Sequence, residues 1–525
     1  MIFPSLKQSK TIINQHDCKN IPIGCEILSD IKTPMEVLKI LKENNKHCFM
    51  LESVENLEKW GRYTIIGFDP ILEITCENSF LQIKGYKNLN KTTKNPGKYI
   101  REIIHENRSP SLPEFPPFTG GLVGYFAYDY IKYSESSLNF DQDNSKNQKL
   151  KSSFEKSFDE SFKDVDLMLF DKVIVFDNFK QKMILIANIK VENIEEEYKK
   201  AVFKLKKLIN LIKNDKSNSS LNSSSNNSSE NNFKLKGDFK PLFSKEKYSK
   251  MVDKVKNYIK EGDVFQVVLS NPLSCEIQGS LLDTYRILRT TNPSPYMFYF
   301  SSEDIEIAGA SPETLVKLHN RQLYTFPLAG TRPRGGTEEE DKKLEKELLS
   351  DEKELAEHNM LVDLGRNDIG KISEFGSVKL DKYLSIEKFS HVMHIGSTVT
   401  GKLRKDKDYL DVIDAILPAG TLSGAPKIRA CEIINELESN KRGIYGGAIG
   451  YISLSGNVDT CIAIRIAFSK NNRVFIRSGA GIVADSVPEK EFDECMNKAK
   501  AVLNALKLSE DLSKGFIINN KPPNF

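Results

Sequence analysis

A stretch rich in asparagine and serine divides the chain and limits what it can fold into. Between Asn214 and Asn232, fifteen of nineteen residues are Asn or Ser, a composition that buries too little apolar surface to offset the entropy lost on ordering. The chain, at 525 residues, is also longer than one ordinary hydrophobic core. The sequence therefore predicts an N-terminal unit over 1–213, a disordered insertion or linker over 214–236, a second unit over 237–515 and a tail over 516–525.

The balance of charges excludes partners that depend on a strong electrostatic field. The chain has 75 Lys and Arg against 72 Asp and Glu, for a net charge of +3, so we expect no nucleic-acid or membrane partner. The first residues have neither the apolar segment of a signal peptide nor the Arg-rich pattern of a transit peptide. The eight cysteines are scattered without metal-ligand spacing and are expected to be reduced thiols. We expect a cytoplasmic protein, with a plastid location as an open alternative.

Both halves mix strand and helix patterns. In the N-terminal half, runs such as VDLMLFDKVIVFD and KMILIANIKV predict strands, and apolar residues at helical spacing predict a helix from Ile194 to Leu211. In the C-terminal half we expect a helix from the N-cap Ser244 to a stop at Gly262, followed by the strand FQVVLS. Gln266 interrupts the apolar pattern of that strand, so it lies either on the solvent face or at a site.

Two Glu-x-x-Glu pairs, Glu354/Glu357 and Glu491/Glu494, are the first candidates for chemistry. Residues three apart share one face of a helix, so each pair points two carboxylates the same way. If the fold brings these faces together, the carboxylates suit a hard divalent cation, and Mg²⁺ is the natural choice. The alternative is two ordinary solvated helix faces.

Each pair is expected on a helix because a capping box precedes it. Thr337 with Glu340 starts the first helix, and Ser486 with Glu489 starts the second.

Two glycine-rich segments invite a nucleotide-binding interpretation. GTLSGAPK, at 420–427, lacks the GK[ST] of a phosphate loop. SGAGIVADS contains Gly479-x-Gly481-x-x-Ala484, but the next helix is expected only after Ser486, too late for glycines that should open it. Their N–H groups could still hold a carboxylate. A nucleotide-binding module therefore stays as the alternative from another class.

From about Pro241 to Leu508 the chain carries an ordered series of unusual segments. They are FQVVLS, NPSPYMFY, GASPE, PLAGTRPRG, EHNMLVDLGRND, VMHI, GTLSGAPK, YGGAIGY, AIRIA, SGAGIVADS and the last Glu-x-x-Glu. This series resembles the chorismate-binding enzymes. LESVENLEKWGRYTIIG, from Leu51, and FTGGLVGYFAYD, from Phe118, resemble the large subunit (component I) of anthranilate synthase. The resemblance implies an α+β fold of two large antiparallel β-sheets packed as a sandwich with flanking helices.

Two positions bear on the reaction. Family members that add water to chorismate typically have a lysine at the position of Gln266, and glutamine cannot act as a general base toward water. Aminodeoxychorismate synthases have a lysine where this chain has Ala329, which cannot form a covalent amine adduct. Both positions favour formation of anthranilate and pyruvate from chorismate and ammonia through aminodeoxyisochorismate, the first committed step of tryptophan biosynthesis. The alternative is aminodeoxychorismate synthase component I, or an enzyme that also serves folate synthesis.

The resemblance also implies the roles of the site residues. It implies that Mg²⁺ is held by Glu354, Glu357, Glu491 and Glu494. It implies that chorismate is bound by Gly330, Thr331, Thr421, Tyr445, Arg465, Gly479, Ala480 and Gly481. The catalytic residues that it implies are His394, Glu313, Thr421 and Gln266. Glu313 is the expected acid for the departing hydroxyl, and His394 is expected to transfer a proton during loss of pyruvate.

Regulation and partners follow from the same resemblance. It implies inhibition by tryptophan at a site formed by Glu52, Ser53, Pro295, Tyr296, Met297 and Tyr451. No cysteine lies in the nucleophile elbow of a glutaminase. We therefore expect ammonia to come from a separate glutamine amidotransferase subunit (component II), in a heteromeric assembly such as a heterotetramer.

Overall fold

The computed structural model describes residues 2–53, 61–138, 158, 161–214, 233–388 and 392–513. Most of the predicted insertion at 214–236 and the whole predicted tail at 516–525 lie outside these residues. Among the helices described, none combines the length and apolar character needed to cross a membrane.

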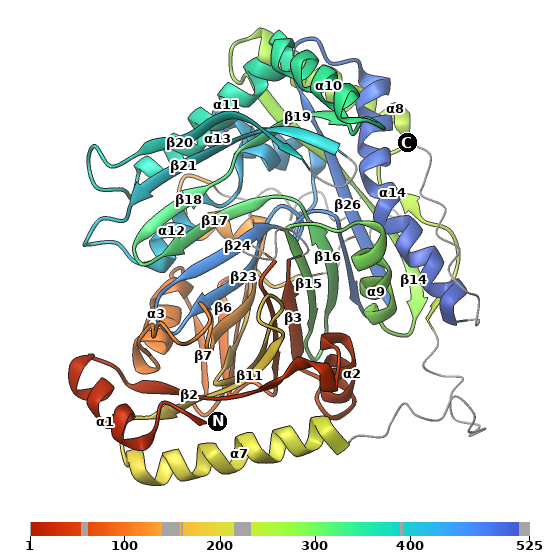
Figure 1. Cartoon of the computed structure of the whole chain (residues 1–525). Coiled ribbons are helices and arrows are strands. Elements are labelled where there is room, and N and C mark those ends of the chain that lie inside the picture. The colour runs from red at the N-terminus through yellow and green to blue at the C-terminus, as the bar shows by residue number, and fades with distance from the viewer. Residues whose placement is uncertain are drawn as a thin grey trace.

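The described residues form two large antiparallel sheets (Figure 1). The first has 14 strands, in the spatial order β1 (Ile2–Phe3), β2 (Asn20–Leu28), β11 (Lys182–Lys190), β10 (Lys172–Asp177), β4 (Tyr63–Phe68), β3 (Cys48–Glu52), β15 (Tyr296–Ser301), β16 (Glu306–Ser311), β25 (Ile466–Lys470), β26 (Arg473–Ile482), β14 (Gln266–Gln278) and β12 (Lys234–Leu235), with β13 (Lys240–Pro241) and β22 (Gly424–Ala425) paired to β14. The second has 12, in the order β19 (Leu328–Pro333), β21 (Val392–Lys402), β18 (Gln322–Thr325), β17 (Thr314–His319), β24 (Val458–Ile462), β23 (Ala448–Ser453), β8 (Gly121–Phe126), β9 (Val165–Phe170), β5 (Leu72–Glu77), β6 (Phe80–Gly85) and β7 (Leu89–Thr92), with β20 (Lys379–Lys388) paired to β21.

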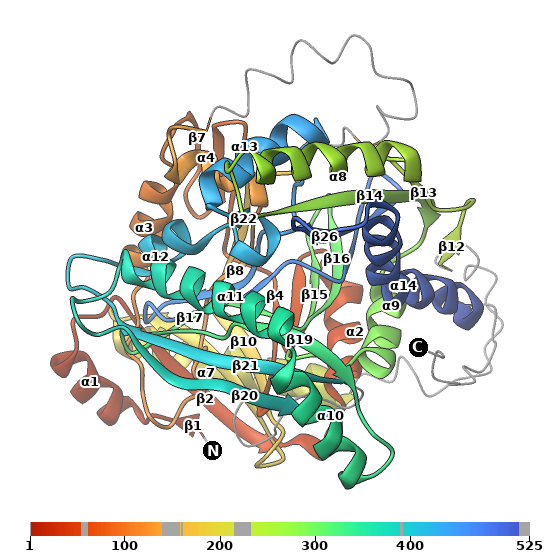
Figure 2. The same cartoon turned by 90° about the horizontal axis from the view of Figure 1, so that it is seen from above.

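Helices cover the outer faces of both sheets (Figures 1 and 2). The described α-helices are α1 (Leu6–Gln15), α2 (Pro34–Asn44), α3 (Pro96–Glu106), α4 (Ile131–Ser134), α7 (Ile194–Asn214), α8 (Lys245–Lys260), α9 (Leu282–Thr291), α10 (Glu338–Ser350), α11 (Glu352–Gly370), α12 (Tyr409–Ile416), α13 (Lys427–Glu438) and α14 (Pro488–Ser513). The short 3₁₀ turns are η1 (Ser29–Ile31), η2 (Tyr128–Tyr130) and η4 (Gly420–Leu422). Helices α2, α7, α9 and α14 pack on the first sheet, and α3, α11 and α12 pack on the second.

The inner faces of the two sheets share one core. Phe49 of β3 meets Phe170 of β9 edge to face, with ring centroids 4.8 Å apart. The same buried cluster includes Phe298 of β15 and Ile449 of β23. Burial of large apolar side chains between two facing sheets is the main favourable contribution to such a sandwich. The predicted α+β sandwich with flanking helices is confirmed.

The two halves of the sequence interleave in space. Strand β3 of the N-terminal half pairs with β15 of the C-terminal half, with Glu52 opposite Met297. In the second sheet β8 pairs with β23, with Val123 opposite Tyr451. The ranges 1–213 and 237–515 thus describe the sequence, whereas each sheet is built from both.

Local sequence signals account for some element boundaries. Ser244 caps α8 as predicted, and its hydroxyl accepts a hydrogen bond from the Lys247 amide at 3.2 Å. The helix stops at Lys260, before Gly262, which has a φ of 86° that suits glycine. The helix predicted from Ile194 is α7, which continues to Asn214.

Candidate functional site

Two neighbouring connections between the sheets build the centre of the candidate site. The chain passes from β16 to β17 through Glu313, and returns from β24 to β25 through Arg465. The two connections are bonded to each other, because the Ile462 amide donates to the Glu313 carbonyl at 3.0 Å and the Ala310 amide donates to the Arg465 carbonyl at 3.2 Å. Arg465 has a φ of 51°, which is uncommon for a side chain of this size and is typical of functional positions.

Glu313 is a protonatable group near neutral pH. Burial raises the pKa of its carboxyl to about 7, although the hydroxyl of Thr421 and the charges of Lys498 and Arg465 act in the opposite direction. The Thr421 hydroxyl donates to Glu313 Oε1 at 2.9 Å. Thr421 is held in η4, within the GTLSGAPK segment. A carboxyl that keeps its proton near pH 7 can act as a general acid.

His394 lies on β21, where it faces β19. Its Nδ1 is 2.8 Å from the Gly330 carbonyl oxygen and 3.1 Å from Thr331 Oγ1. Because a carbonyl only accepts, Nδ1 carries the proton of the neutral ring and Nε2 is the basic nitrogen. Burial lowers the pKa of His394, so the ring is neutral at physiological pH and can accept a proton. Gly330 has a φ of 65°, and a Cβ there would lie 3.2 Å from Glu354 Oε2, which ties this strand to α11.

The predicted glycines lie inside β26 and line up with β14. A Cβ at Gly481 would come within 2.4 Å of Gln266 Nε2, so the amide of Gln266 fills the space beside that glycine. Gln266 is buried, which excludes the solvent-face alternative for this residue. A Cβ at Gly479 would lie 3.1 Å from the hydroxyl oxygen of buried Tyr445. Ala480 is buried between the two glycines.

This placement contradicts the nucleotide-binding alternative. The dinucleotide fingerprint needs its glycines in the turn between a strand and the following helix. Gly479 and Gly481 instead lie within an antiparallel strand, opposite Ser270 and Val268 of β14.

The two Glu-x-x-Glu pairs lie near the starts of two helices, but these starts differ from the predicted ones. The predicted helix from Thr337 ends at Ser350, and a second helix, α11, carries Glu354 and Glu357. Asp351 caps α11, and its carboxylate accepts from the amides of Lys353 and Glu354 at 3.1 and 3.2 Å. The predicted single helix is interrupted at Asp351, because the N-cap geometry of this aspartate starts a new helix and competes with continuation of α10.

Both predicted capping boxes are incomplete. Thr337 accepts from the Glu340 amide at 3.2 Å, but the Glu340 carboxylate accepts from Gly336 instead of closing the box. Helix α14 starts at Pro488, and the Ser486 hydroxyl accepts from the Val483 amide at 3.1 Å. Proline suits the first helical position because its missing N–H would be unpaired there.

The fold brings the four carboxylates into one electrostatic neighbourhood. Burial and the charges of Glu354 and Glu494 raise the pKa of Glu357. Burial likewise raises the pKa of Glu491, with a further contribution from Glu494. The carboxyl of Glu357 is thus partly removed from water, although Glu357 and Glu494 as whole residues remain exposed to solvent. Like charges held together on an exposed surface, with only oxygen donors, fit a hard divalent cation such as Mg²⁺.

The carboxylates do not close on a common point. Within the described part of the chain, no three His, Cys, Asp or Glu side chains are close enough to hold a metal ion. Glu494 pairs with Lys498 at 2.8 Å, and Glu354 lies 3.4 Å from Arg332. The Mg²⁺ site therefore stays a prediction.

Lys498 is the residue that the sequence analysis missed. Its ammonium pairs with Glu494 at 2.8 Å, and its charge acts to lower the pKa values of Glu313, Glu357 and Glu491. The signal was available, because Lys498 follows Glu494 by one helical turn on the face that both predicted glutamates share.

The residues predicted to bind tryptophan lie where the two sheets meet. Tyr296 of β15 donates to Asp459 of β24 at 2.9 Å, which bridges the sheets, and Asp459 lies opposite Tyr451 of β23. Met297 is buried beside Glu52, and Pro295 precedes β15.

Glu52 is already engaged. It accepts a hydrogen bond from the Tyr285 hydroxyl at 2.5 Å and forms an ion pair with Arg289. An incoming ammonium would thus compete with Arg289 for this carboxylate. Ser53 follows at the end of β3, next to residues 54–60, which lie outside the described part.

Comparison with known proteins places these observations in a family. The model of the chorismate binding enzymes matches residues 46–504. The anthranilate synthase component 1 of Acetivibrio thermocellus is 44% identical over 515 residues, which cover 97% of this chain and 99% of that protein. The structure of anthranilate synthase component I from Streptococcus pneumoniae TIGR4 matches with a TM-score of 0.69 and 38% identity, covering 91% and 98%. The menaquinone-specific isochorismate synthase of Escherichia coli, 17% identical with a TM-score of 0.65 over 96% and 99%, is similar in fold alone.

Proposed function

The chain belongs to the chorismate-binding enzymes and, within that family, to the anthranilate synthase large subunits, and from this premise we propose how its residues make anthranilate. The observation that carries the proposal is the position of Glu313. Its carboxyl has a pKa of about 7, accepts a hydrogen bond from Thr421 and feels the charges of Arg465 and Lys498.

Chorismate is a dicarboxylate, and the cations of the site suit it. Arg465 is accessible to solvent and can bind one carboxylate with two parallel hydrogen bonds. The Tyr445 hydroxyl and the backbone of Gly479, Ala480 and Gly481 complete this subsite for the enolpyruvyl carboxylate. Gly330 and Thr331 contact the ring side, next to His394.

The ring carboxylate faces the four glutamates in this proposal. Glu357 and Glu494, with Glu354 and Glu491 beside them, would hold Mg²⁺. When bound, Mg²⁺ neutralises the ring carboxylate and withdraws electron density from the ring.

Glu313 and His394 divide the proton transfers. Ammonia attacks ring carbon 2, Glu313 gives its proton to the hydroxyl that leaves carbon 4 as water, and the new ammonium loses a proton that restores Glu313. His394 then takes the proton from carbon 2, and the carbon 3–oxygen bond breaks as the ring becomes aromatic. The enolate that leaves takes up a proton to become pyruvate. Thr421 keeps the carboxyl of Glu313 oriented toward the leaving group.

The residues at positions 266 and 329 favour free ammonia as the nucleophile. Gln266 places a neutral amide beside Gly481, and Ala329, opposite Ile395 of β21, offers no amine for a covalent adduct. These two residues support amination at carbon 2 over the aminodeoxychorismate and isochorismate reactions.

Tryptophan inhibition is part of the proposal. Tyr296, one of the residues assigned to that site, accepts a hydrogen bond from Thr314 at 3.1 Å, and Thr314 directly follows Glu313. A ligand that moves Tyr296 would thereby move the connection that carries the acid. Allosteric coupling requires one structural element whose conformation both sites influence. The connection that carries Glu313 and Thr314 is the proposed element.

Ammonia in the cell is proposed to come from a separate glutamine amidotransferase subunit. All eight cysteines of the chain are buried and free, so none presents the exposed nucleophile of a glutaminase. The name component 1 of the relatives also implies a second component.

The test is an assay of the purified chain with chorismate, Mg²⁺ and an ammonium salt, followed by fluorescence and chromatography, with and without tryptophan. We expect anthranilate from ammonium but not from glutamine, and less of it with tryptophan. Adding the amidotransferase subunit should restore activity with glutamine. Formation of 4-amino-4-deoxychorismate, isochorismate or salicylate instead would contradict the roles of Gln266 and Ala329.

A further inference from the structure

A cluster of three charged side chains lies buried behind the candidate site. Glu438, at the end of α13, meets Arg442 and Arg477, and these residues are 2%, 3% and 4% exposed. We name Glu438, Arg442 and Arg477 the Glu438 cluster. None of the roles assigned above uses it. Burying three charges costs free energy unless their hydrogen bonds are satisfied. The cluster is therefore expected to have a structural or functional role that offsets this cost.

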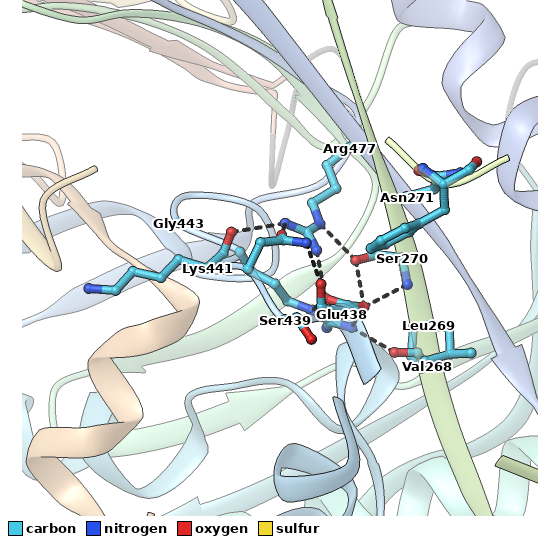
Figure 3. Close-up of polar contacts among 12 residues, drawn as sticks. Val268, Leu269, Ser270, Asn271, Glu438, Ser439, Lys441, Gly443 and Arg477 are labelled. Carbon is cyan, nitrogen blue, oxygen red and sulfur yellow. Dashed lines mark hydrogen bonds and ion pairs between the residues drawn. The ribbon is translucent and has the colours of Figure 1, made fainter. Parts of the chain in front are cut away.

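Glu438 is fully paired. Its Oε1 accepts from Arg442 Nη2 at 2.6 Å, and its Oε2 accepts from Arg442 Nε at 2.9 Å and from Arg477 Nη2 at 2.6 Å. The amide and hydroxyl of Ser270 also donate to Oε1, at 2.8 and 2.9 Å. Figure 3 shows that Arg477 and Ser270 both reach the carboxylate of Glu438 and also contact each other. Burial alone would raise the pKa of Glu438, but the two arginines and their hydrogen bonds together hold it below its ordinary value.

The arginines extend these contacts to the backbone of separate segments. Arg442 Nη1 donates to the Leu422 carbonyl at 2.5 Å, and Arg442 Nη2 donates to the Val268 carbonyl at 2.7 Å. Arg477 donates to the Ser270 hydroxyl at 2.7 Å. The cluster therefore joins the η4 turn, strand β14 and strand β26.

Each of these segments carries a group assigned to chorismate. Leu422 follows Thr421, the residue bonded to Glu313. Ser270 lies opposite Gly479 in the β14–β26 pair. The ring of Tyr445, whose hydroxyl lies beside Gly479, is 6.0 Å from the guanidinium carbons of both Arg442 and Arg477.

We propose that Glu438 is a positioning residue which, through Arg442 and Arg477, fixes the Thr421 turn, the Gly479 strand and Tyr445 in the geometry that binds chorismate. This inference rests on the proposed function. Its physical basis is the planar fork of arginine, which reaches several acceptors at fixed angles where a lysine reaches one point.

Three variants of the full-length chain test the proposal by steady-state kinetics on chorismate with ammonium and Mg²⁺. Glu438→Gln keeps the shape of the side chain but removes its charge, and we expect the KM for chorismate to rise about tenfold. Arg442→Lys keeps the charge and removes the fork. It should raise the same KM and also lower kcat, because Arg442 alone of the cluster holds the Leu422 carbonyl. Ser270→Ala removes one hydroxyl and should raise KM about threefold.

A matched control separates positioning from general stability. Glu306 is also paired, with Lys42 at 2.6 Å and the Ser280 hydroxyl at 2.6 Å, and its side chain is only 13% exposed, but it lies at the far end of β16 from Glu313. Glu306→Gln should lower the Tm while leaving the KM for chorismate within twofold of wild type. In all four variants the KM for ammonium should stay within twofold, because ammonia does not contact these groups.

The outcomes distinguish this inference from the proposed function. If the wild-type chain makes no anthranilate, the proposed function fails and this inference fails with it. If the wild type is active and folded Arg442→Lys and Ser270→Ala keep wild-type kinetic constants, only the positioning role is overturned. An equal rise in KM in Glu306→Gln would also overturn it. Should Glu438→Gln fail to fold, the other two variants still decide.

Discussion

The Glu438 cluster and the four glutamates of the Glu-x-x-Glu pairs are two concentrations of charge with opposite designs. In the first, the side chains of Glu438 and Arg442 are 0% and 1% exposed and every carboxylate oxygen has partners. In the second, Glu494 and Lys498 are 51% and 49% exposed, and the pKa of Glu357 is raised by burial and neighbouring carboxylates. The charges of the Glu438 cluster are paired without a ligand, whereas the four glutamates leave negative charge that a bound cation would neutralise.

This difference separates residues that maintain the fold from residues that bind. A satisfied buried network is rigid, and removing one member leaves an uncompensated charge. Exposed like charges repel each other and gain from a bound cation. Substitutions among the four glutamates should therefore mainly lower activity, whereas substitutions in the Glu438 cluster should mainly lower the free energy of unfolding.

The largest effect is expected at the open set. Glu357→Gln should lower kcat/KM for chorismate by about 1,000-fold, because it removes a proposed metal ligand and several kcal/mol of transition-state stabilisation. The Tm should stay level or rise slightly, since a like-charge contact is lost. The control is Glu352→Gln, an exposed residue of the first turn of α11, which should leave both kinetics and Tm unchanged. Normal activity of Glu357→Gln would show that the four glutamates do not form a binding site, and would contradict the difference drawn between the two clusters.

A substitution in the buried Glu438 cluster should affect stability more strongly than activity. Glu438→Gln should lower the free energy of unfolding by about 3 kcal/mol, because breaking a buried ion pair leaves charges without a partner. Chemical denaturation monitored by circular dichroism measures this value. A change below about 0.5 kcal/mol, the level of an exposed pair, would show that the cluster is not a stabilising unit.

A pH dependence is also predicted for Glu313, which belongs to neither set. The folded protein holds this proton more tightly than the unfolded chain, since the pKa rises from 4.5 to about 7. The free energy of unfolding should thus fall as pH rises from about 4.5 to about 7, by about 2 kcal/mol after allowance for partial exposure. Glu313→Gln should remove this slope and be more stable than wild type at pH 8.

The same protonation should govern catalysis. As an acid, Glu313 must be protonated, so kcat should fall about tenfold per pH unit above pH 7. The pKa of this carboxyl is lowered by the hydrogen bond from Thr421 and by the charges of Lys498 and Arg465, which act against the effect of burial. A kcat that stays constant from pH 6 to pH 9, at saturating ammonia, would assign the acid to another group.

The smallest effect is expected at an exposed ion pair. Glu246 and Lys250 of α8 lie 2.6 Å apart and are 80% and 72% exposed. Glu246→Gln should leave the free energy of unfolding unchanged, because solvent screens this exposed pair. A loss comparable with that of Glu438→Gln would mean that burial does not explain the difference between the clusters.

The sequence predicted features that depend on local signals. The helix after Ser244 follows from its cap and its glycine stop, and motif order indicated the sandwich fold. The break at Asp351 was missed because the surrounding residues favour helix on both sides, so the cap was hidden within one continuous pattern.

The arrangement of the site depends on contacts that sequence spacing does not encode. Glu313 and Arg465 become neighbours only because two connections cross between the sheets side by side. Glu438 and Arg442, one helical turn apart in sequence, look like an ordinary surface ion pair. They are buried by contacts with distant segments, which include Val268 and Ser270 of β14, Leu422 of η4 and the ring of Tyr128. Lys498, in contrast, could have been found from the face of α14 that carries Glu491 and Glu494.

The distinction between the two clusters can be tested by calorimetric titration of Mg²⁺ into the purified chain, in ammonium-free buffer containing chorismate. We expect a saturable Mg²⁺ signal in the wild type that disappears in Glu357→Gln and Glu494→Gln and persists in Arg442→Lys. An unchanged Mg²⁺ signal in the two glutamate variants would show that the exposed carboxylates are not the cation site.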